Sequence, residues 1–418
     1  MSVKSLLIVL QSLILSFTLI FAQGTGKKLR VEVGAKVFIN NQLDLVIGKN
    51  IGFITNHTST LPGGIHLADT LVKIPGVKIG ALFGPEHGIR GNNPDGVGIS
   101  DGIDTKTGVK VFSLYGKYRK PTPEMLEGID VLLFDIQDVG ARFYTFISTM
   151  YYGIEAAAEN NIPIIILDRP NPIGGLLVDG PIVLDSLKSF VGIAPIPIIH
   201  GMTVGELALM FNEELWINSK NKADLTIIKM NNWSRNLFYD ECGIEWIKPS
   251  PNLPKLENAI VYPGMCLFEA VNISEGRGTQ NPFLIIGAPY LNSQAVIDEM
   301  SQKDFTSVRL FPTEFTPRAI PEMSNNPKYK DELCQGIQIE VVNRNDFNPL
   351  RFGISLLNTI HKLYPAELEF RRNSLERLAG TTYLRSAILN NYDDETIFNY
   401  WENELNDFKI LRKKYLLY

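Results

Sequence analysis

The sequence predicts an α/β protein built on a doubly wound, mostly parallel sheet, followed by a smaller α+β domain. Two observations indicate the sheet: several short runs are almost unbroken Val, Ile and Leu, and a helix-length segment separates two of them. A third observation, the change of pattern after residues 281–283, indicates the second domain. We place the first domain at residues 28–275 and the second at residues 282–418.

Five runs in the first domain have strand character. A parallel strand is covered on both faces, so its residues are apolar without alternation. Between the last two runs, residues 141–160 are long enough for a helix, and Ala156 to Ala158 favour one. Strand, helix and strand in this order imply right-handed crossovers. The predicted strands are residues 50–55, 77–83, 109–114, 130–136 and 162–168.

The second domain combines strands with amphipathic helices. Its strand-like runs are separated by one short helix, and two longer helical patterns follow them. The expected strands are residues 283–289, 308–315 and 336–342, and the expected helices are residues 293–301, 353–363 and 395–411.

Composition excludes several classes of protein. A formal net charge of −5 over 418 residues leaves no broad basic surface, which argues against nucleic acid as the main partner. Three cysteines make no disulfide framework, and we expect three buried thiols. The five histidines lack metal-ligand spacing, so we expect no metal site.

The first 22 residues have the pattern of a secretory signal peptide. Lys4 precedes an apolar stretch from Leu6 to Ala22, and Ala22 is a small residue suited to a cleavage site. The alternative is an uncleaved membrane anchor, for which the stretch is short. We therefore expect an exported protein with no stable membrane span after the signal is removed.

Polar side chains follow three of the predicted strands. In an open parallel sheet, ligands gather outside the carboxyl ends of the strands, so these three loops are expected to converge on one crevice. The loops are GPEHGIRG (84–91) with Glu86, His87 and Arg90, QDVGARFYT (137–145) with Asp138 and Arg142, and LDRPNPIGG (167–175) with Asp168, Arg169 and Asn171.

Common motifs of this fold class are missing from the sequence. No G-x-G-x-x-G opens a helix after the first strand, and no Walker-type G-K-[ST] or G-x-S-x-G elbow occurs. The loops instead place carboxylates close to arginines, which suits acid–base chemistry on an uncharged bond of an anionic substrate. TVGE (203–206) fits a capping box, so we interpret Glu206 as structural.

Six motifs stand in the order found in one known family. They are GPEHGIRG, DIQDVGARFYTFISTM, LDRPNPIGG, HGMTVGE, SPNLP and YPGMCLFEAVNISEGRGTQNPF. From about residue 30 to its carboxyl terminus the chain thereby resembles the exo-β-N-acetylmuramidase family of peptidoglycan glycoside hydrolases, formerly a domain of unknown function. The resemblance implies a Rossmann-like domain, a smaller carboxyl-terminal domain, and an active site in the cleft between them.

The resemblance also implies a reaction and a place in the cell. Family members release N-acetylmuramic acid from the non-reducing ends of peptidoglycan fragments. The implied partners are peptidoglycan-derived disaccharides or muropeptides, with no cofactor. The implied location is the periplasm or the exterior of a bacterium.

Glycoside hydrolysis usually needs two carboxyl groups, one of which protonates the leaving oxygen. We choose Glu86 as the acid, because it lies on a stiff turn after a buried strand and at the centre of its motif. For the second carboxylate we rank Asp168 and Asp138 ahead of Glu275, and Glu155 last. The substrate's own N-acetyl oxygen is an alternative nucleophile.

Recognition of muramic acid is expected to involve arginine. Its lactyl carboxylate suits a planar guanidinium better than an ammonium group. At least one arginine of the motifs is expected to form a structural ion pair with Asp138 or Asp168 instead. The arginine candidates are Arg90, Arg142, Arg277 and Arg169, and the other candidate substrate contacts are His87, Tyr144, Asn171, His200, Asn252, Asn272 and Glu275.

Two other functions fit the same patterns. One is a β-N-acetylglucosaminidase-type exo-glycosidase on the same scaffold. The other is a periplasmic sugar-binding protein, although such receptors usually have two similar lobes, whereas the second domain here is shorter and differently patterned.

Overall fold

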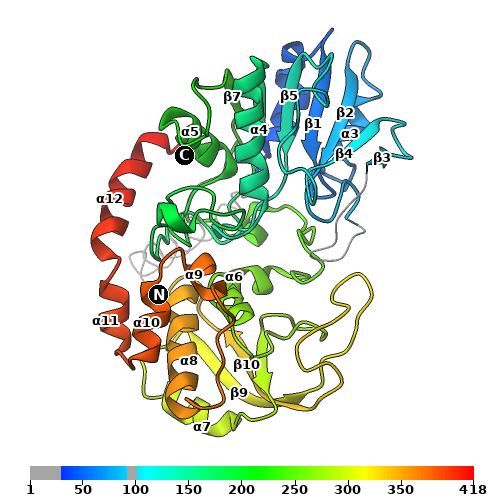
Figure 1. Cartoon of the computed structure of the whole chain (residues 1–418). Coiled ribbons are helices and arrows are strands. Elements are labelled where there is room, and N and C mark those ends of the chain that lie inside the picture. The colour runs from blue at the N-terminus through cyan, green and yellow to red at the C-terminus, as the bar shows by residue number, and fades with distance from the viewer. Residues whose placement is uncertain (1–29, 92–100) are drawn as a thin grey trace, which may run out of the picture. The chain divides into compact units, whose positions relative to one another are not determined.

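A seven-stranded sheet organises the first part of the chain in the computed structural model, which describes residues 30–91 and 101–418 (Figure 1). Its strand order is β3-β4-β2-β1-β5-β6-β7, and every neighbouring pair is parallel except β3 with β4. The strands are β1 (Asn50–Thr55), β2 (Lys78–Gly84), β3 (Gly102–Ile103), β4 (Lys110–Ser113), β5 (Val131–Asp135), β6 (Ile164–Leu167) and β7 (Leu225–Ile228).

Helices cover both faces of this sheet. In β5, Val131 and Leu133 pack with α2 (Gly34–Asn41) and α3 (Leu67–Leu71) in one hydrophobic cluster. Leu132 and Phe134 point to the other face, in the cluster that contains α4 (Phe146–Asn160) and α5 (Val204–Glu213). Because alternate residues of one strand enter different cores, the whole strand is apolar, which confirms the prediction of a doubly wound parallel sheet.

The order of the strands changes direction at β1. The chain passes from β1 to β2 and β4 on one side, and then returns to β5, β6 and β7 on the other side. The carboxyl ends of β2 and β5 therefore lie on either side of β1. In sheets of this kind, such a switch point is where ligands bind.

A second sheet, which is antiparallel and has three strands in the order β8-β10-β9, lies in the later part of the chain. This confirms a second, smaller α+β region, and its helices pack around the sheet (Figure 1). The elements are β8 (Ile285–Ala288), β9 (Val308–Phe315), β10 (Cys334–Val341), α6 (Leu256–Met265), α7 (Ser293–Met300), α8 (Pro349–Leu363), α9 (Ser374–Ala379), α10 (Tyr383–Leu389), α11 (Asp394–Asn399) and α12 (Glu402–Arg412).

The two sheets share a continuous hydrophobic core, and α6 and α8 meet in it. Gly264 of α6 and Gly353 of α8 allow this contact, because a Cβ atom on Gly264 would lie 1.8 Å from the carbonyl oxygen of Pro349. The close packing fixes α6, and with it the short helix η4 (Cys266–Ala270) that follows directly.

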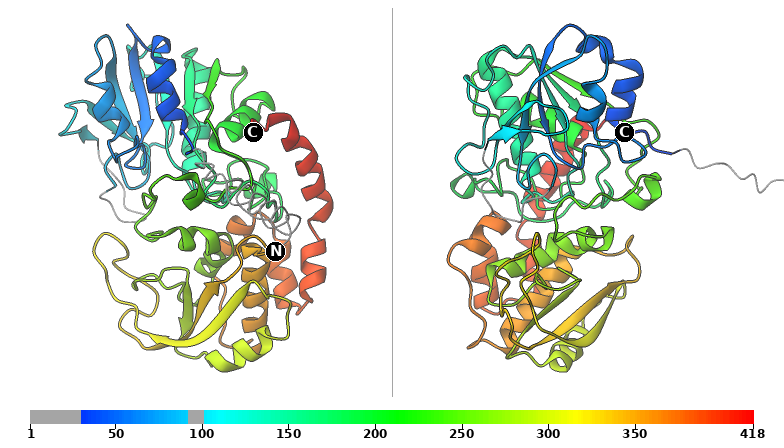
Figure 2. Two further views of the ribbon diagram at one scale, coloured as in Figure 1. Left: turned by 180° about the vertical axis from the view of Figure 1, so that it is seen from behind. Right: turned by 90° about the vertical axis from the view of Figure 1, so that its right-hand side faces the viewer.

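After α11, α12 leads the chain back to the parallel sheet. Seen from behind, α12 runs along the side of the molecule from the antiparallel sheet towards α5 (Figure 2). Beyond it, η5 (Lys413–Tyr415) packs against α5. Arg412 donates hydrogen bonds to the carbonyl oxygens of His200, Gly201 and Gly175 at 3.0–3.2 Å, which ties α12 to the loops of the parallel sheet.

Several predicted elements are confirmed and one is wrong. All eight predicted strands occur, most of them one or two residues shorter at an end, and Thr203 and Glu206 form the predicted capping box of α5. The single helix expected over residues 395–411 is instead α11 and α12, which are separated near the buried Trp401.

Two expectations concern the ends and the cysteines of the chain. The predicted signal peptide, residues 1–22, lies outside the described residues. In the part of the chain that is described, no helix is both long and apolar enough to cross a membrane. Cys242, Cys266 and Cys334 are buried free thiols, as predicted.

Candidate active site

The loop after β2 presents Glu86 from a constrained turn. His87 has φ +69° and Gly88 has φ +74°, and the amide of Gly88 donates a hydrogen bond to the carbonyl oxygen of Pro85 at 3.0 Å. A left-handed conformation is unfavourable for histidine and persists only where the surroundings enforce it. His87 is 3% exposed, so its packing holds the turn that positions Glu86.

Glu86 is bonded to the loop that follows β5. The hydroxyl of Thr145 donates a hydrogen bond to Glu86 Oε2 at 3.0 Å. Thr145 is the residue before α4, so the bond links the loop at the end of β2 to the beginning of the helix after β5. Two of the three predicted loops therefore meet at Glu86.

Glu86 lines a cavity of about 180 Å³ with residues from both parts of the chain. Its walls include Phe143 and Tyr144 from the loop after β5, and Tyr262 and Phe283 from beyond the parallel sheet. These rings pack edge to face, with centroids 5.0–5.9 Å apart. A polar cavity with aromatic walls and a carboxylate is typical of a site for a sugar ring.

A second carboxylate, Glu269, lines the same cavity. It lies in η4, and its Oε1 is 2.5 Å from Nη1 of Arg277, which also lines the cavity. The sequence interpretation missed Glu269, although the residue is inside the last matched motif. Its position directly after α6, with its backbone in a short helix, gave it the appearance of an ordinary helical surface residue.

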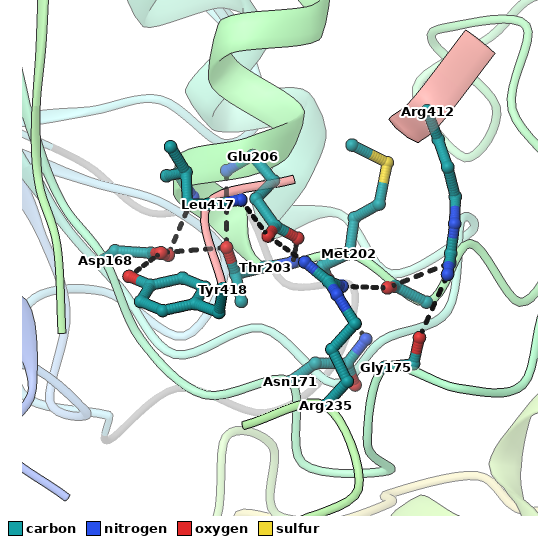
Figure 3. Close-up of polar contacts among 12 residues, drawn as sticks. Asp168, Asn171, Gly175, Met202, Thr203, Glu206, Arg235, Arg412, Leu417 and Tyr418 are labelled. Atoms are coloured by element: carbon teal, nitrogen blue, oxygen red, sulfur yellow. Dashed lines mark hydrogen bonds and ion pairs between the residues drawn. The ribbon is translucent and has the colours of Figure 1, made fainter. Parts of the chain in front are cut away.

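Asp168 is not among the residues that line this cavity. It is fully buried, and its two oxygens accept hydrogen bonds from the amides of Arg169 and Gly205 and from the hydroxyls of Thr203 and Tyr418, at 2.7–2.9 Å (Figure 3). Burial raises the pKa of Asp168 to about 7, against the opposing effect of these donors. These contacts hold Asp168 at the start of α5 and Asp168 does not line the cavity, so its catalytic role stays a prediction that the geometry does not favour.

Asp138 is also buried away from the cavity wall. Its Oδ2 accepts a hydrogen bond from the amide of Gly140 at 2.7 Å, and its Oδ1 has no hydrogen-bond partner among the described residues. Burial raises the pKa of Asp138 to about 7. The geometry favours Glu269 over Asp138 as the partner of Glu86, because only Glu269 shares the cavity.

All four candidate arginines form contacts within the protein, and three of them do not line the cavity. Arg90 pairs with Asp69 and Asp104 at 2.7 and 2.6 Å, and Arg169 pairs with the buried Asp135. Arg142 is fully buried and donates to three carbonyl oxygens, one of which belongs to Leu378 of the cavity wall. These three arginines do not line the cavity, and Arg277 is the one candidate arginine that does.

The remaining candidates divide in the same way. His87 and Tyr144 line the cavity. Six others do not line it and are held by internal contacts: Asn171 by Met202, His200 by the amide of Met202, Asn252 by Met323, Asn272 by Glu367 and Glu369, Glu155 by Lys120, and Glu275 by Lys328. Burial lowers the pKa of His200 to about 3, so this imidazole is neutral.

A metal centre does not appear in the described part of the protein. Within residues 30–91 and 101–418, no group of three or more His, Cys, Asp or Glu side chains is placed to hold a metal ion.

The chain matches known proteins along almost its whole length. The family model described as the N-terminal part of the exo-β-N-acetylmuramidase NamZ matches residues 51–257, and the model of the C-terminal part matches residues 260–418. The peptidoglycan β-N-acetylmuramidase NamZ of Bacillus subtilis (strain 168) is 44% identical over 400 residues, which cover 94% of this chain and 93% of that protein.

Solved structures are similar as well. Two DUF1343 family proteins from Bacteroides fragilis NCTC 9343 superpose with TM-scores of 0.86 and 0.77, at 35% and 38% sequence identity. Each comparison covers 93% of this chain and 99% of the other.

Proposed function

We propose, since the chain belongs to the exo-β-N-acetylmuramidase family, that it hydrolyses the bond linking a terminal N-acetylmuramic acid to the rest of a peptidoglycan fragment. The observation that supports this most directly is the cavity in which Glu86 and Glu269 are the two carboxylic side chains. A pair of carboxyl groups about one sugar is what glycoside hydrolysis requires.

Glu86 is the general acid of this proposal. As the bond between the anomeric carbon and the bridging oxygen breaks, Glu86 donates its proton to that oxygen, which leaves as a hydroxyl on the shortened fragment. Water supplies the hydroxyl of the released sugar, and the remaining proton of that water restores the carboxyl group of Glu86. The bond from Thr145 and the turn at His87 fix the direction from which the proton comes.

Glu269 is the second carboxylate. Its ion pair with Arg277 requires the ionised form, which is the form that a group opposite the acid needs. Positive charge develops at the anomeric carbon in the transition state, and an ionised carboxylate in the same cavity stabilises it. The aromatic walls formed by Phe143, Tyr144, Tyr262 and Phe283 hold the apolar faces of the ring.

Export completes the proposal. The substrate is part of the bacterial cell wall, and the apolar segment of residues 6–22 is suited to direct the chain out of the cytoplasm. Determination of the amino-terminal residue of the protein recovered from outside the cytoplasm tests this, and a protein that retains Met1 and stays in the cytoplasm contradicts it.

The test of the function is a product assay. The protein is incubated with the disaccharide of N-acetylmuramic acid β-1,4-linked to N-acetylglucosamine, and the Glu86→Gln variant is the control. The products are separated and identified by mass spectrometry. Free N-acetylmuramic acid from the wild type alone supports the proposal. Binding without release would indicate a sugar-binding protein, and faster turnover of a nitrophenyl N-acetylglucosaminide than of the muramide would indicate a glucosaminidase.

A further inference from the structure

A second, larger cavity adjoins the cavity that contains Glu86. It has a volume of about 410 Å³, and four residues line both: Val191, Glu269, Arg277 and Leu378. A substrate that occupies the first cavity can therefore extend into the second. We call the second one the basic cavity, because Arg277, Lys328, Arg371 and Arg377 line it against only two carboxylates, Glu269 and Glu275.

Both carboxylates of the basic cavity are paired with cations of its inner wall. Arg277 Nη1 lies 2.5 Å from Glu269 and 3.4 Å from Glu275, and Lys328 Nζ lies 2.9 Å from Glu275. Lys328 also donates to the carbonyl oxygens of Phe268 and Ile273, so its position is fixed from several sides. The inner wall is thus electrically balanced.

The outer wall is not balanced. The side chains of Arg371, just before α9, and of Arg377, within α9, are exposed, and neither forms a hydrogen bond or an ion pair with any residue in the described ranges. The charge of Arg371 also adds to burial in lowering the pKa of Lys328. Two guanidinium groups therefore bring uncompensated positive charge to the mouth of a cavity that continues to Glu86.

The chemistry of the proposed substrate supplies one matching group. The ring of N-acetylmuramic acid is uncharged apart from its lactyl ether, which ends in a carboxylate. A planar carboxylate is the partner that the fork of a guanidinium recognises best, with up to two parallel hydrogen bonds. The corresponding glucosamine derivative lacks the whole lactyl group, so a site for this group discriminates between the two sugars.

We propose that Arg371 and Arg377 bind the lactyl carboxylate of the N-acetylmuramic acid residue whose glycosidic bond lies at Glu86, and that they set the preference for muramides over glucosaminides. This inference depends on the proposed function. It differs from the prediction based on the motifs, since Arg90, Arg142 and Arg169 are engaged elsewhere and Arg277 is paired with Glu269 and Glu275. Arg371 and Arg377 lie outside all six motifs.

The test compares two chromogenic substrates across single and double variants. Arg371→Met and Arg377→Met keep an unbranched apolar stem and remove the guanidinium and its charge, and Arg372→Met is the matched control, because Arg372 is exposed next to Arg371 but does not line the basic cavity. The measurement is kcat/KM on nitrophenyl N-acetylmuramide and on nitrophenyl N-acetylglucosaminide, with a melting curve for each variant.

Each lining variant is expected to lose about tenfold to a hundredfold on the muramide, mainly through KM, because a charge-assisted hydrogen bond is lost. The kcat/KM value on the glucosaminide is expected to stay within about twofold of wild type. The ratio of the muramide value to the glucosaminide value therefore decreases, and it decreases most in the double variant. Arg372→Met should leave both values at the wild-type level. Arg377→Lys should keep part of the preference for the muramide, because this variant retains the charge without the planar fork of donors.

Two results overturn the inference. One is a ratio of the two kcat/KM values that is unchanged in the double variant, whether both values fall equally or neither falls. The other is a defect that appears only on fragments carrying a stem peptide, which would assign the basic cavity to the peptide. If the wild-type protein hydrolyses muramides but the ratio of kcat/KM on the muramide to kcat/KM on the glucosaminide does not depend on Arg371 and Arg377, this inference alone is wrong. A wild-type protein that releases no N-acetylmuramic acid removes the proposed function as well.

Discussion

The hydroxyl of Thr145 donates a hydrogen bond to Glu86 Oε2 at 3.0 Å, and this bond joins the loop after β2 to the start of α4, the helix that follows β5. The strands β2 and β5 lie on either side of β1. The carboxyl group of Glu86 has two oxygens, and the bond from Thr145 occupies one of them. Thr145 is thus a positioning residue for the proposed acid.

Removing this hydroxyl should slow turnover without unfolding the protein. Thr145→Val keeps the shape of the side chain and is expected to lower kcat about tenfold on the natural disaccharide, with KM close to wild type, because a hydrogen bond to a carboxyl group is lost. Thr145→Ser retains the hydroxyl and should stay within about threefold of wild type. Equal defects in the two variants would show that the methyl group, and not the hydrogen bond, is what matters.

Glu269 should be as indispensable as Glu86. Glu269→Gln keeps the size of the side chain but removes the negative charge, and we expect kcat to fall by roughly 10²–10⁴-fold. Glu257→Gln is the control, because Glu257 is exposed on α6, a short distance before Glu269 in the chain. Steady-state kinetics on the disaccharide make the comparison, and activity of Glu269→Gln within a few-fold of wild type would exclude this residue from the mechanism.

Asp138 should affect the pH dependence of stability. Its pKa is raised from 3.8 to about 7 by burial, so the folded state binds this proton more tightly than the unfolded state does. As the pH rises from about 4 to about 7, the unfolded state ionises first and the free energy of unfolding falls. Asp138→Asn removes this dependence, so the variant should gain stability relative to wild type between pH 5 and pH 8.

Urea unfolding at the two pH values measures this change. Asp407→Asn, at an exposed position of α12, is the control and should follow wild type at both values. We expect kcat of Asp138→Asn to remain within a few-fold of wild type. A relative stability that does not increase with pH contradicts the structural role of a buried, protonated Asp138.

Tyr418 should contribute to stability and not to catalysis. Its hydroxyl donates to Asp168 Oδ2 at 2.7 Å (Figure 3). It also accepts a hydrogen bond from the amide of Met230 at 2.8 Å. Tyr418→Phe removes one hydrogen-bond partner from the carboxyl group of Asp168 and one from the amide of Met230, and it should lower the free energy of unfolding by about 1–3 kcal/mol. Tyr400→Phe, on an exposed ring, is the control for the loss of a hydroxyl.

The melting temperature and kcat of Tyr418→Phe together decide whether Tyr418 and Asp168 contribute to stability or to catalysis. A lower melting temperature with kcat unchanged is the expected result for Tyr418→Phe. A loss of kcat at unchanged stability would return Asp168 to the list of catalytic candidates.

The parallel sheet could be predicted because burial on both faces leaves a direct trace in the sequence. Residues such as Leu132 and Leu133 are both apolar only because different helices cover them. The position of Glu86 in the wall of a cavity could be predicted for a related reason, because Glu86 follows a buried strand on a Gly/Pro-rich turn, and the end of a parallel strand is where such sheets bind ligands. The role of Glu86 as the acid stays a prediction.

The choice among the other carboxylates could not be made from the sequence. Asp168 and Glu86 both follow strands, but only tertiary structure shows that Thr203 and Tyr418, far along the chain, occupy the oxygens of Asp168. The packing of α6 against α8, which also depends on tertiary structure, places Glu269 in the same cavity as Glu86. Arg377 comes to the cavity from a helix that has no local signal for binding.

The central claim is that Glu86 protonates the leaving oxygen, and substrates with different leaving groups test it most directly. Nitrophenolate is stable enough to leave with little protonation, whereas the sugar hydroxyl of the natural disaccharide is not. Glu86→Gln keeps the shape of the side chain and removes its proton. The measurement is kcat/KM of wild type and Glu86→Gln on both substrates.

We predict a loss of roughly 10²–10⁴-fold on the disaccharide and a much smaller loss on the nitrophenyl muramide, with the melting temperature unchanged. Equal losses on the two substrates would contradict the account, because they would mean that Glu86 binds the sugar or supports the fold instead of delivering a proton.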